Sequence, residues 1–79
     1  MPQFDVFGRR GCHLCETLIE ELTILVRDRA RLVVHDVDTH PAWREQYGHA
    51  VPVVEAGGRE LCRYRLDQDA VLAILAAGR

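Results

Sequence analysis

An amphipathic helix pattern enclosed by two strand patterns is the feature that most restricts the fold of this chain. Residues 3–7 alternate apolar and polar side chains with a period of two, which predicts a strand. From Cys12 onward, leucines recur at helical spacing: Leu14, Leu18, Leu22 and Leu25. Residues 32–37 predict a second strand, and their unbroken apolar start favours a central position covered on both faces. The chain is therefore expected to open with a βαβ unit.

The middle of the chain predicts a short helix followed by a β-hairpin. A helix over residues 42–47 is expected to end at Gly48, which would take the left-handed conformation that glycine permits. Residues 51–55 and 59–64 predict two strands, and Gly57-Gly58 between them supplies a tight turn.

A last helix follows the hairpin. Asp67 is a good N-cap, Val71, Ile74 and Leu75 share one face, and Gly78 is expected to end the helix. The predicted order is βαβαββα, which indicates an α/β fold with a four-stranded mixed sheet and three flanking helices. With 79 residues, the chain has room for a single domain spanning residues 1–79.

Composition and charge exclude several classes of protein. A formal net charge of −2 argues against a dedicated nucleic-acid-binding protein, which would usually be basic. No apolar run approaches the roughly 20 residues needed to cross a bilayer, so no membrane association is expected. The first residues lack a basic region followed by an apolar run, so the pattern predicts a cytoplasmic protein, which we expect to be monomeric.

Two of the three cysteines lie close together, in Cys12-His13-Leu14-Cys15, where the first strand gives way to the first helix. Residues i and i+3 share one face of a helix, so these two sulfurs are close enough to form a bridge. Amide groups and the helix dipole at the opening turn favour the thiolate form of Cys12, which is the nucleophilic form. Cys15 lies one turn deeper and suits the resolving role in thiol–disulfide exchange. His13 and the Arg9-Arg10 pair are expected to add positive charge beside Cys12.

These motifs together resemble the small glutaredoxin-like family of the thioredoxin-fold superfamily. The resemblance extends over nearly the whole chain and rests on four motifs in order: Gly11-Cys12-His13-Leu14-Cys15, Asp36-Val37-Asp38, Tyr47-Gly48 and Val51-Pro52-Val53-Val54. It implies a thioredoxin-like fold and a thiol–disulfide oxidoreductase with Cys12 as nucleophile and Cys15 as its partner. It also implies a cis peptide bond before Pro52, which would leave the Val51 backbone free to pair with an extended thiol substrate.

The resemblance also defines the expected substrate site and electron supply. Val51, Pro52, His13 and Arg10 would surround the substrate, which would be a disulfide-containing protein or a glutathione mixed disulfide. No bound cofactor is expected. The electrons would come from glutathione as a co-substrate or from a thioredoxin-type reductase.

Two departures from the family pattern concern glutathione. Glutaredoxins that use glutathione commonly carry proline after the first cysteine, where this chain has His13. They also carry a glycine pair before the last helix, and residues 64–69 contain no glycine. The use of glutathione is therefore less strongly predicted than dithiol chemistry.

Other interpretations of the same residues remain open at this point. The alternative function is a non-catalytic thioredoxin-fold binding module whose cysteines hold zinc or an iron–sulfur centre. Zinc takes four ligands, for which Cys12, Cys15, Cys62 and a histidine would be available. Cys62 is better explained by packing than by redox chemistry, because unpaired cysteine is among the most buried residue types. Trp43 and Tyr47, four residues apart, are expected to pack on the sheet.

Overall fold

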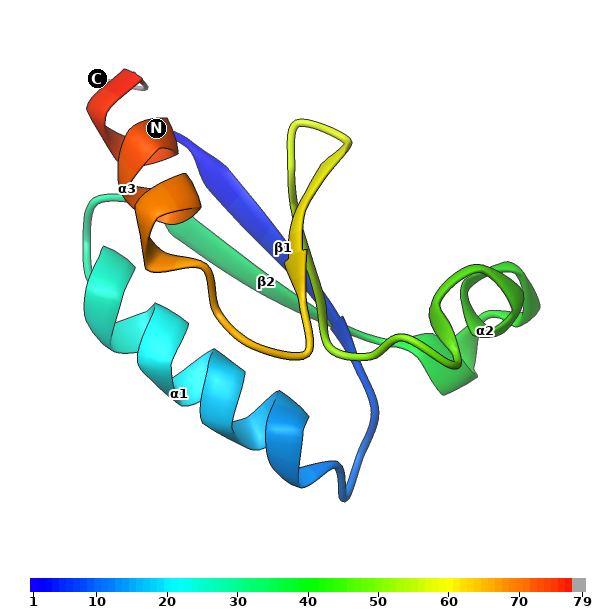
Figure 1. Cartoon of the computed structure of the whole chain (residues 1–79). Helices are drawn as coiled ribbons and strands as arrows, with labels where there is room; N and C mark the ends of the chain where they lie inside the picture. Colours follow the sequence, from blue (N-terminus) through cyan, green and yellow to red (C-terminus); the bar gives the residue numbers. More distant parts are fainter. Residues whose placement is uncertain (78–79) are drawn as a thin grey trace.

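The computed structural model describes residues 1–77, and the expected helix end at Gly78 lies outside them. The order of elements is βαβαββα, as predicted, with one additional turn of 3₁₀ helix, η1 (Figure 1). The elements along the chain are β1 (Gln3–Gly8), α1 (His13–Val26), β2 (Arg31–Asp36), η1 (Val37–Thr39), α2 (Pro41–Tyr47), β3 (Val53–Ala56), β4 (Arg59–Arg63) and α3 (Gln68–Ala77). No helix within residues 1–77 is long and apolar enough to cross a membrane.

The four strands form one mixed sheet in the order β2-β1-β3-β4. β1 pairs in parallel with β2 and antiparallel with β3, so Phe7 lies opposite both His35 and Val53. The strand predicted over residues 32–37 is therefore an edge strand, and its predicted central position is wrong. Both faces of this strand are only partly covered: Leu32 packs against the core but Val34, on the same face, is 51% exposed, and Val33, on the other face, is half-buried.

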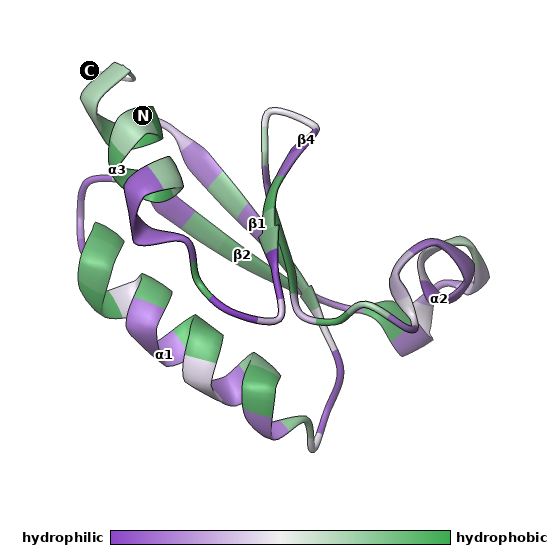
Figure 2. Ribbon diagram, viewed as in Figure 1, coloured by the Kyte–Doolittle hydropathy of each residue, from purple (hydrophilic) through white to green (hydrophobic). Residues whose placement is uncertain are grey.

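The main core lies between the sheet and the two helices α1 and α3, which cover the same face (Figure 1). Hydropathy alternates along β1 (Figure 2), so every second side chain of this strand, including Phe4 and Val6, points into that core. Leu22 and Val71 are fully buried opposite them. Cys62 is half-buried and packs against this core, as its packing interpretation predicts.

A smaller aromatic core lies on the opposite face of the sheet, beneath α2. Phe7 stacks on Tyr47 with ring centroids 4.2 Å apart and on His35 at 4.7 Å. Trp43 contacts Phe7 edge-on at 5.6 Å, so both aromatic residues of α2 pack on the sheet as predicted. Tyr47 also donates a hydrogen bond of 2.7 Å to the half-buried carboxylate of Glu55 on β3.

The end of α2 differs from the prediction. Gly48 has φ −54° and ψ −26°, so it continues the helical turn instead of taking the left-handed conformation. Its amide donates to the carbonyl of Arg44, and a Cβ at position 48 would collide with that carbonyl oxygen. Glycine is thus needed here for space, and a positive φ is not the reason. The hairpin turn behaves as predicted, with positive φ at Gly57 and Gly58.

Candidate active site

The two neighbouring cysteines occupy the opening turn of α1. Cys12 is the N-cap residue, and its Sγ accepts a hydrogen bond of 3.3 Å from the backbone amide of Cys15. The carbonyl of Cys12 accepts from the amide of Glu16 at 3.0 Å, which begins the helical ladder. Cys12 is half-buried and Cys15 is only 2% exposed, and both are free thiols. An outer sulfur thus lies at the helix N-terminus, with an inner sulfur one turn deeper.

Burial controls the protonation of the inner thiol. It raises the pKa of Cys15 to about 11, and the hydrogen bond with the Cys12 side chain acts in the same direction. A backbone hydrogen bond from Arg9 and the charge of Arg9 lower this pKa by less. Cys15 therefore carries its proton at neutral pH.

Gly8, the last residue of β1, allows Cys15 to come close to the sheet. A Cβ placed on Gly8 would lie 3.2 Å from the Sγ of Cys15, which is tighter than ordinary van der Waals contact. The strand and the opening turn of α1 therefore meet at a position that has no side chain.

Arg9 and Asp38 form the best-connected ion pair near the dithiol. The Nε and Nη2 atoms of Arg9 lie 2.9 and 3.2 Å from the two carboxylate oxygens of Asp38. This pair holds the pKa of the Asp38 carboxyl below its usual range. The positive charge that Arg9 was expected to add beside Cys12 is therefore opposed by a carboxylate.

His13 and Arg10 lie on opposite flanks of α1. His13 lines an open groove of about 410 Å³ between α1 and the β4–α3 loop, which we call the His13 groove. Arg10 lines a hollow of about 460 Å³ on the other flank, where Cys15, Ile19 and Val34 also contribute. The structure thus places the two predicted substrate-binding side chains in different depressions.

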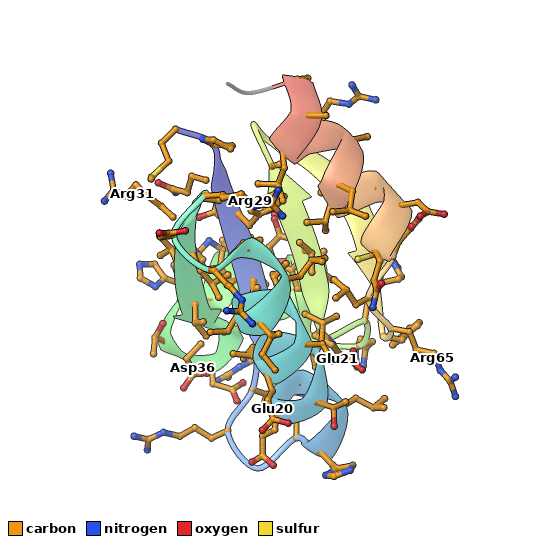
Figure 3. The ribbon with its side chains drawn as sticks, turned by 90° about the vertical axis from the view of Figure 1, so that its left-hand side faces the viewer. Glu20, Glu21, Arg29, Arg31, Asp36 and Arg65 are labelled. Carbon is orange, nitrogen blue, oxygen red and sulfur yellow. The ribbon has the colours of Figure 1, made fainter. Side chains whose placement is uncertain are left out.

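Apolar and charged side chains both line the His13 groove. Leu14 and Tyr64, 46% and 44% exposed, line it together with Arg65 and Glu21. Arg65 extends outward from the molecule (Figure 3). Tyr64, with φ +68°, is a residue that the sequence analysis did not single out, and no motif in the sequence marks it.

Val51 and Pro52 lie between α2 and β3. Their peptide bond is cis, as the family resemblance implies. Pro52 is buried, and its carbonyl accepts a hydrogen bond of 2.8 Å from the amide of Tyr64. Val51 is half-buried against the aromatic core. Tyr64 thus connects the predicted Val51-Pro52 site with the groove that His13 lines.

The possible metal ligands are spread over the described part of the chain. Within residues 1–77, no three or more His, Cys, Asp or Glu side chains are grouped so that they could hold a metal ion. Cys62, the third cysteine, packs against the main core.

Comparison with known proteins places this chain in a family. Residues 4–76 match the family described as Glutaredoxin-like domain (DUF836). Uncharacterised proteins of Mycobacterium tuberculosis and Mycobacterium bovis are 30% identical to this chain over 81 residues, which cover 95% of this chain and 84% of each relative.

Solved structures show the same fold. A structural-genomics target protein from X. campestris superposes with a TM-score of 0.72 and 29% identity, covering 94% of this chain and 96% of that one. A mutant thioredoxin from Halobacterium salinarum superposes with a TM-score of 0.62 and 24% identity, covering 96% of this chain and 73% of that one. At that identity the thioredoxin shows the fold alone. A glutaredoxin-like thioredoxin fold supports a redox type of function in general terms. The chain belongs to the glutaredoxin-like domain family (DUF836) and has a thioredoxin-like fold.

Proposed function

We propose that this protein is a thiol–disulfide oxidoreductase that reduces disulfides through Cys12 and Cys15. One observation carries the proposal: the half-buried Sγ of Cys12 caps α1, 3.3 Å from the amide of Cys15, whose own thiol is buried one turn deeper. A helix N-terminus stabilises negative charge on such a sulfur, and the buried partner is shielded from competing reactions.

The first step is an attack by the Cys12 thiolate on one sulfur of the substrate disulfide. A Cys12–substrate disulfide forms, the substrate S–S bond breaks, and the other substrate sulfur leaves as a thiolate that takes a proton from water. Cys15 does not compete as the attacking thiol, because its raised pKa keeps it protonated.

The second step resolves this mixed disulfide. Cys15 gives its proton to water, and its thiolate attacks the Sγ of Cys12 and expels the remaining substrate thiolate. The substrate has then gained two electrons and two protons, and the protein has formed a Cys12–Cys15 disulfide. Two equivalents of glutathione, or a thioredoxin-type reductase, would return those two electrons. A reducing compartment such as the cytoplasm would keep the dithiol ready.

The groove beside His13 suits the part of the substrate that flanks the disulfide. Its volume of about 410 Å³ and its exposed Leu14 and Tyr64 would receive an apolar side chain. The Val51 backbone would pair with the substrate main chain. Arg10 would contact the substrate from the hollow on the other flank of α1. Either a protein disulfide or a glutathione mixed disulfide would be the substrate.

Two cysteine variants test the proposal. Turnover of a glutathione mixed disulfide and of a protein disulfide would be measured for the wild type, Cys12→Ser and Cys15→Ser. Cys12→Ser should abolish both activities, because it removes the attacking sulfur. Cys15→Ser should retain reduction of the glutathione mixed disulfide, which an external thiol can complete, and lose reduction of the protein disulfide.

Cys62→Ser is the matched control, since Cys62 packs against the main core instead of lying in the opening turn of α1. It should keep both activities, with folding checked by circular dichroism. Equal activity in the wild type and Cys12→Ser would refute the mechanism.

A further inference from the structure

Arg9 connects two loops that are far apart in the sequence. The chain passes from β1 into α1 through residues 9–12, the dithiol loop, and from α2 into β3 through residues 48–52, the 48–52 segment. The Nη1 atom of Arg9 donates a hydrogen bond of 3.1 Å to the carbonyl of Gly48, 39 residues away. The main-chain carbonyl of Arg9 accepts from the amide of Cys12 at 3.3 Å. A single residue thus contacts both the attacking cysteine and the start of the 48–52 segment.

Asp38 fixes the direction of the Arg9 side chain. The guanidinium binds both carboxylate oxygens of Asp38, a two-point contact that defines its plane as well as its position. Asp38 is itself held, since its amide donates to the Asp36 carboxylate at 2.9 Å and its Oδ1 accepts from the Nε of Arg44 at 3.3 Å. With these partners in place, the guanidinium is held in an orientation that directs an Nη1–H to the carbonyl of Gly48.

Tyr64 holds the same segment from its other side. Its hydroxyl donates to the carbonyl of His49 at 3.3 Å, and its amide donates to the carbonyl of Pro52 at 2.8 Å. The 48–52 segment is therefore held by Arg9, from the dithiol loop, and by Tyr64, from the wall of the His13 groove. Val51 lies between these attachment points.

We propose that Arg9 is a positioning residue that makes the protein selective for disulfides within an extended peptide. This inference rests on the proposed function. By setting the 48–52 segment against the dithiol loop, Arg9 aligns the Val51 backbone with the place where a substrate strand would pair. A peptide disulfide would use this alignment. A small disulfide without a peptide backbone would react with Cys12 and gain nothing from it.

The experiment compares two substrates in a single turnover of the fully reduced protein, so that no electron donor is involved. One substrate is a disulfide between two short peptides, and the other is bis(2-hydroxyethyl) disulfide. In Arg9→Ala, the half-saturating concentration of the peptide disulfide should rise about ten-fold, because small misplacements of substrate-positioning groups have effects of this order or larger. The rate constant for attack of Cys12 on the small disulfide should stay within about two-fold of the wild type, because the variant keeps the main-chain hydrogen bond from Cys12 to residue 9, and the side-chain charge it removes is already opposed by Asp38.

Two further variants complete the test. Arg9→Lys keeps the charge but not the two-point geometry, and its half-saturating concentration should lie between those of the wild type and Arg9→Ala. Arg29→Ala removes an exposed arginine beyond the far end of α1 and should match the wild type with both substrates (Figure 3). If Arg9→Ala does not fold, Arg9→Lys alone decides the question.

The outcomes separate this inference from the proposed function. Equal losses with both substrates would show that Arg9 supports the fold only and would overturn the inference, as would an unchanged half-saturating concentration for the peptide. A wild-type protein that reacts with neither substrate would instead refute the oxidoreductase proposal.

Discussion

The proton on Cys15 has a consequence for the rate of the resolving step. The pKa of this thiol is raised to about 11, mainly by burial, so below that pH its thiolate fraction grows with pH. In the mixed disulfide Cys12 no longer carries a thiol, and burial still raises the pKa of Cys15, so the rate at which Cys15 resolves the mixed disulfide should increase steadily between pH 7 and 9. Stopped-flow release of the bound thiol from a preformed mixed disulfide would measure this rate.

The control for this prediction is Cys15→Ser carrying the same mixed disulfide. In this variant, the rate at which an added external thiol releases the thiol bound to Cys12 should follow the titration of the added thiol instead. A resolving rate that is flat from pH 7 to 9 in the wild type would contradict the assignment of the proton to Cys15.

Some single-residue features of the site can be predicted from the sequence, and others cannot. The Cys12–Cys15 arrangement is local, so strand-to-helix spacing was enough to predict which sulfur lies deeper. The partners of Arg9 were not predictable, because Asp38 and Gly48 lie 29 and 39 residues away. The contacts of Tyr64 were missed for the same reason, since its hydrogen bonds to His49 and Pro52 depend on how β4 lies beside β3.

At the scale of elements, α2 depends on Tyr47 for its attachment to the sheet. Tyr47 is 8% exposed, stacks on Phe7 and donates to Glu55 on β3. Tyr47→Phe keeps the stacked ring but leaves the Glu55 carboxylate without this donor, so the free energy of unfolding at pH 7 should fall by about 1–2 kcal/mol. Urea unfolding followed by fluorescence would measure the change.

Tyr47 should also make the free energy of unfolding depend on pH in the alkaline range. Burial and the bond to Glu55 raise the pKa of Tyr47 to about 12, from a model-compound value of 10.0. The folded protein thus holds this proton more tightly than the unfolded chain, so the contribution is complete below pH 10 and is lost as the pH rises toward 12. Tyr47→Phe should lose less stability than the wild type over this interval. Identical slopes in the wild type and Tyr47→Phe would disprove the effect.

Elements also differ in how well the sequence predicts them. The type and order of the helices and strands follow from local periodicity, and the Asp67 cap is confirmed by its 3.1 Å bond from the amide of Ala70. The place of a strand within the sheet depends on its neighbours. An apolar run such as residues 32–34 is compatible with a central or an edge position, because an edge strand can also be partly covered on both faces, as Leu32 and the half-buried Val33 are here. The conformation of Gly48 at the end of α2 could not be predicted, because a glycine there is compatible either with a positive φ or with a close contact that leaves no room for a Cβ.

For the whole molecule, stability depends mainly on the face of the sheet that α1 and α3 cover. Leu22 is fully buried there, whereas Ile24, two residues along the same helix, is 60% exposed. Leu22→Ala should lower the free energy of unfolding by about 2–5 kcal/mol, a large fraction of the total for a chain of this size. Ile24→Ala should change it by no more than about 0.5 kcal/mol. Chemical denaturation of both variants would test this, and comparable losses would mean that α1 packs with a different face toward the sheet.

The absence of a side chain at Gly8 affects the geometry of the Cys12–Cys15 pair. Any side chain at this position would act as a wedge between the end of β1 and the first turn of α1, because its first carbon already lies 3.2 Å from the Sγ of Cys15. The Cys15 side chain would have to move away by a few tenths of an ångström to make room. How deeply the resolving thiol is buried therefore depends on Gly8, a strand residue that takes no part in the chemistry.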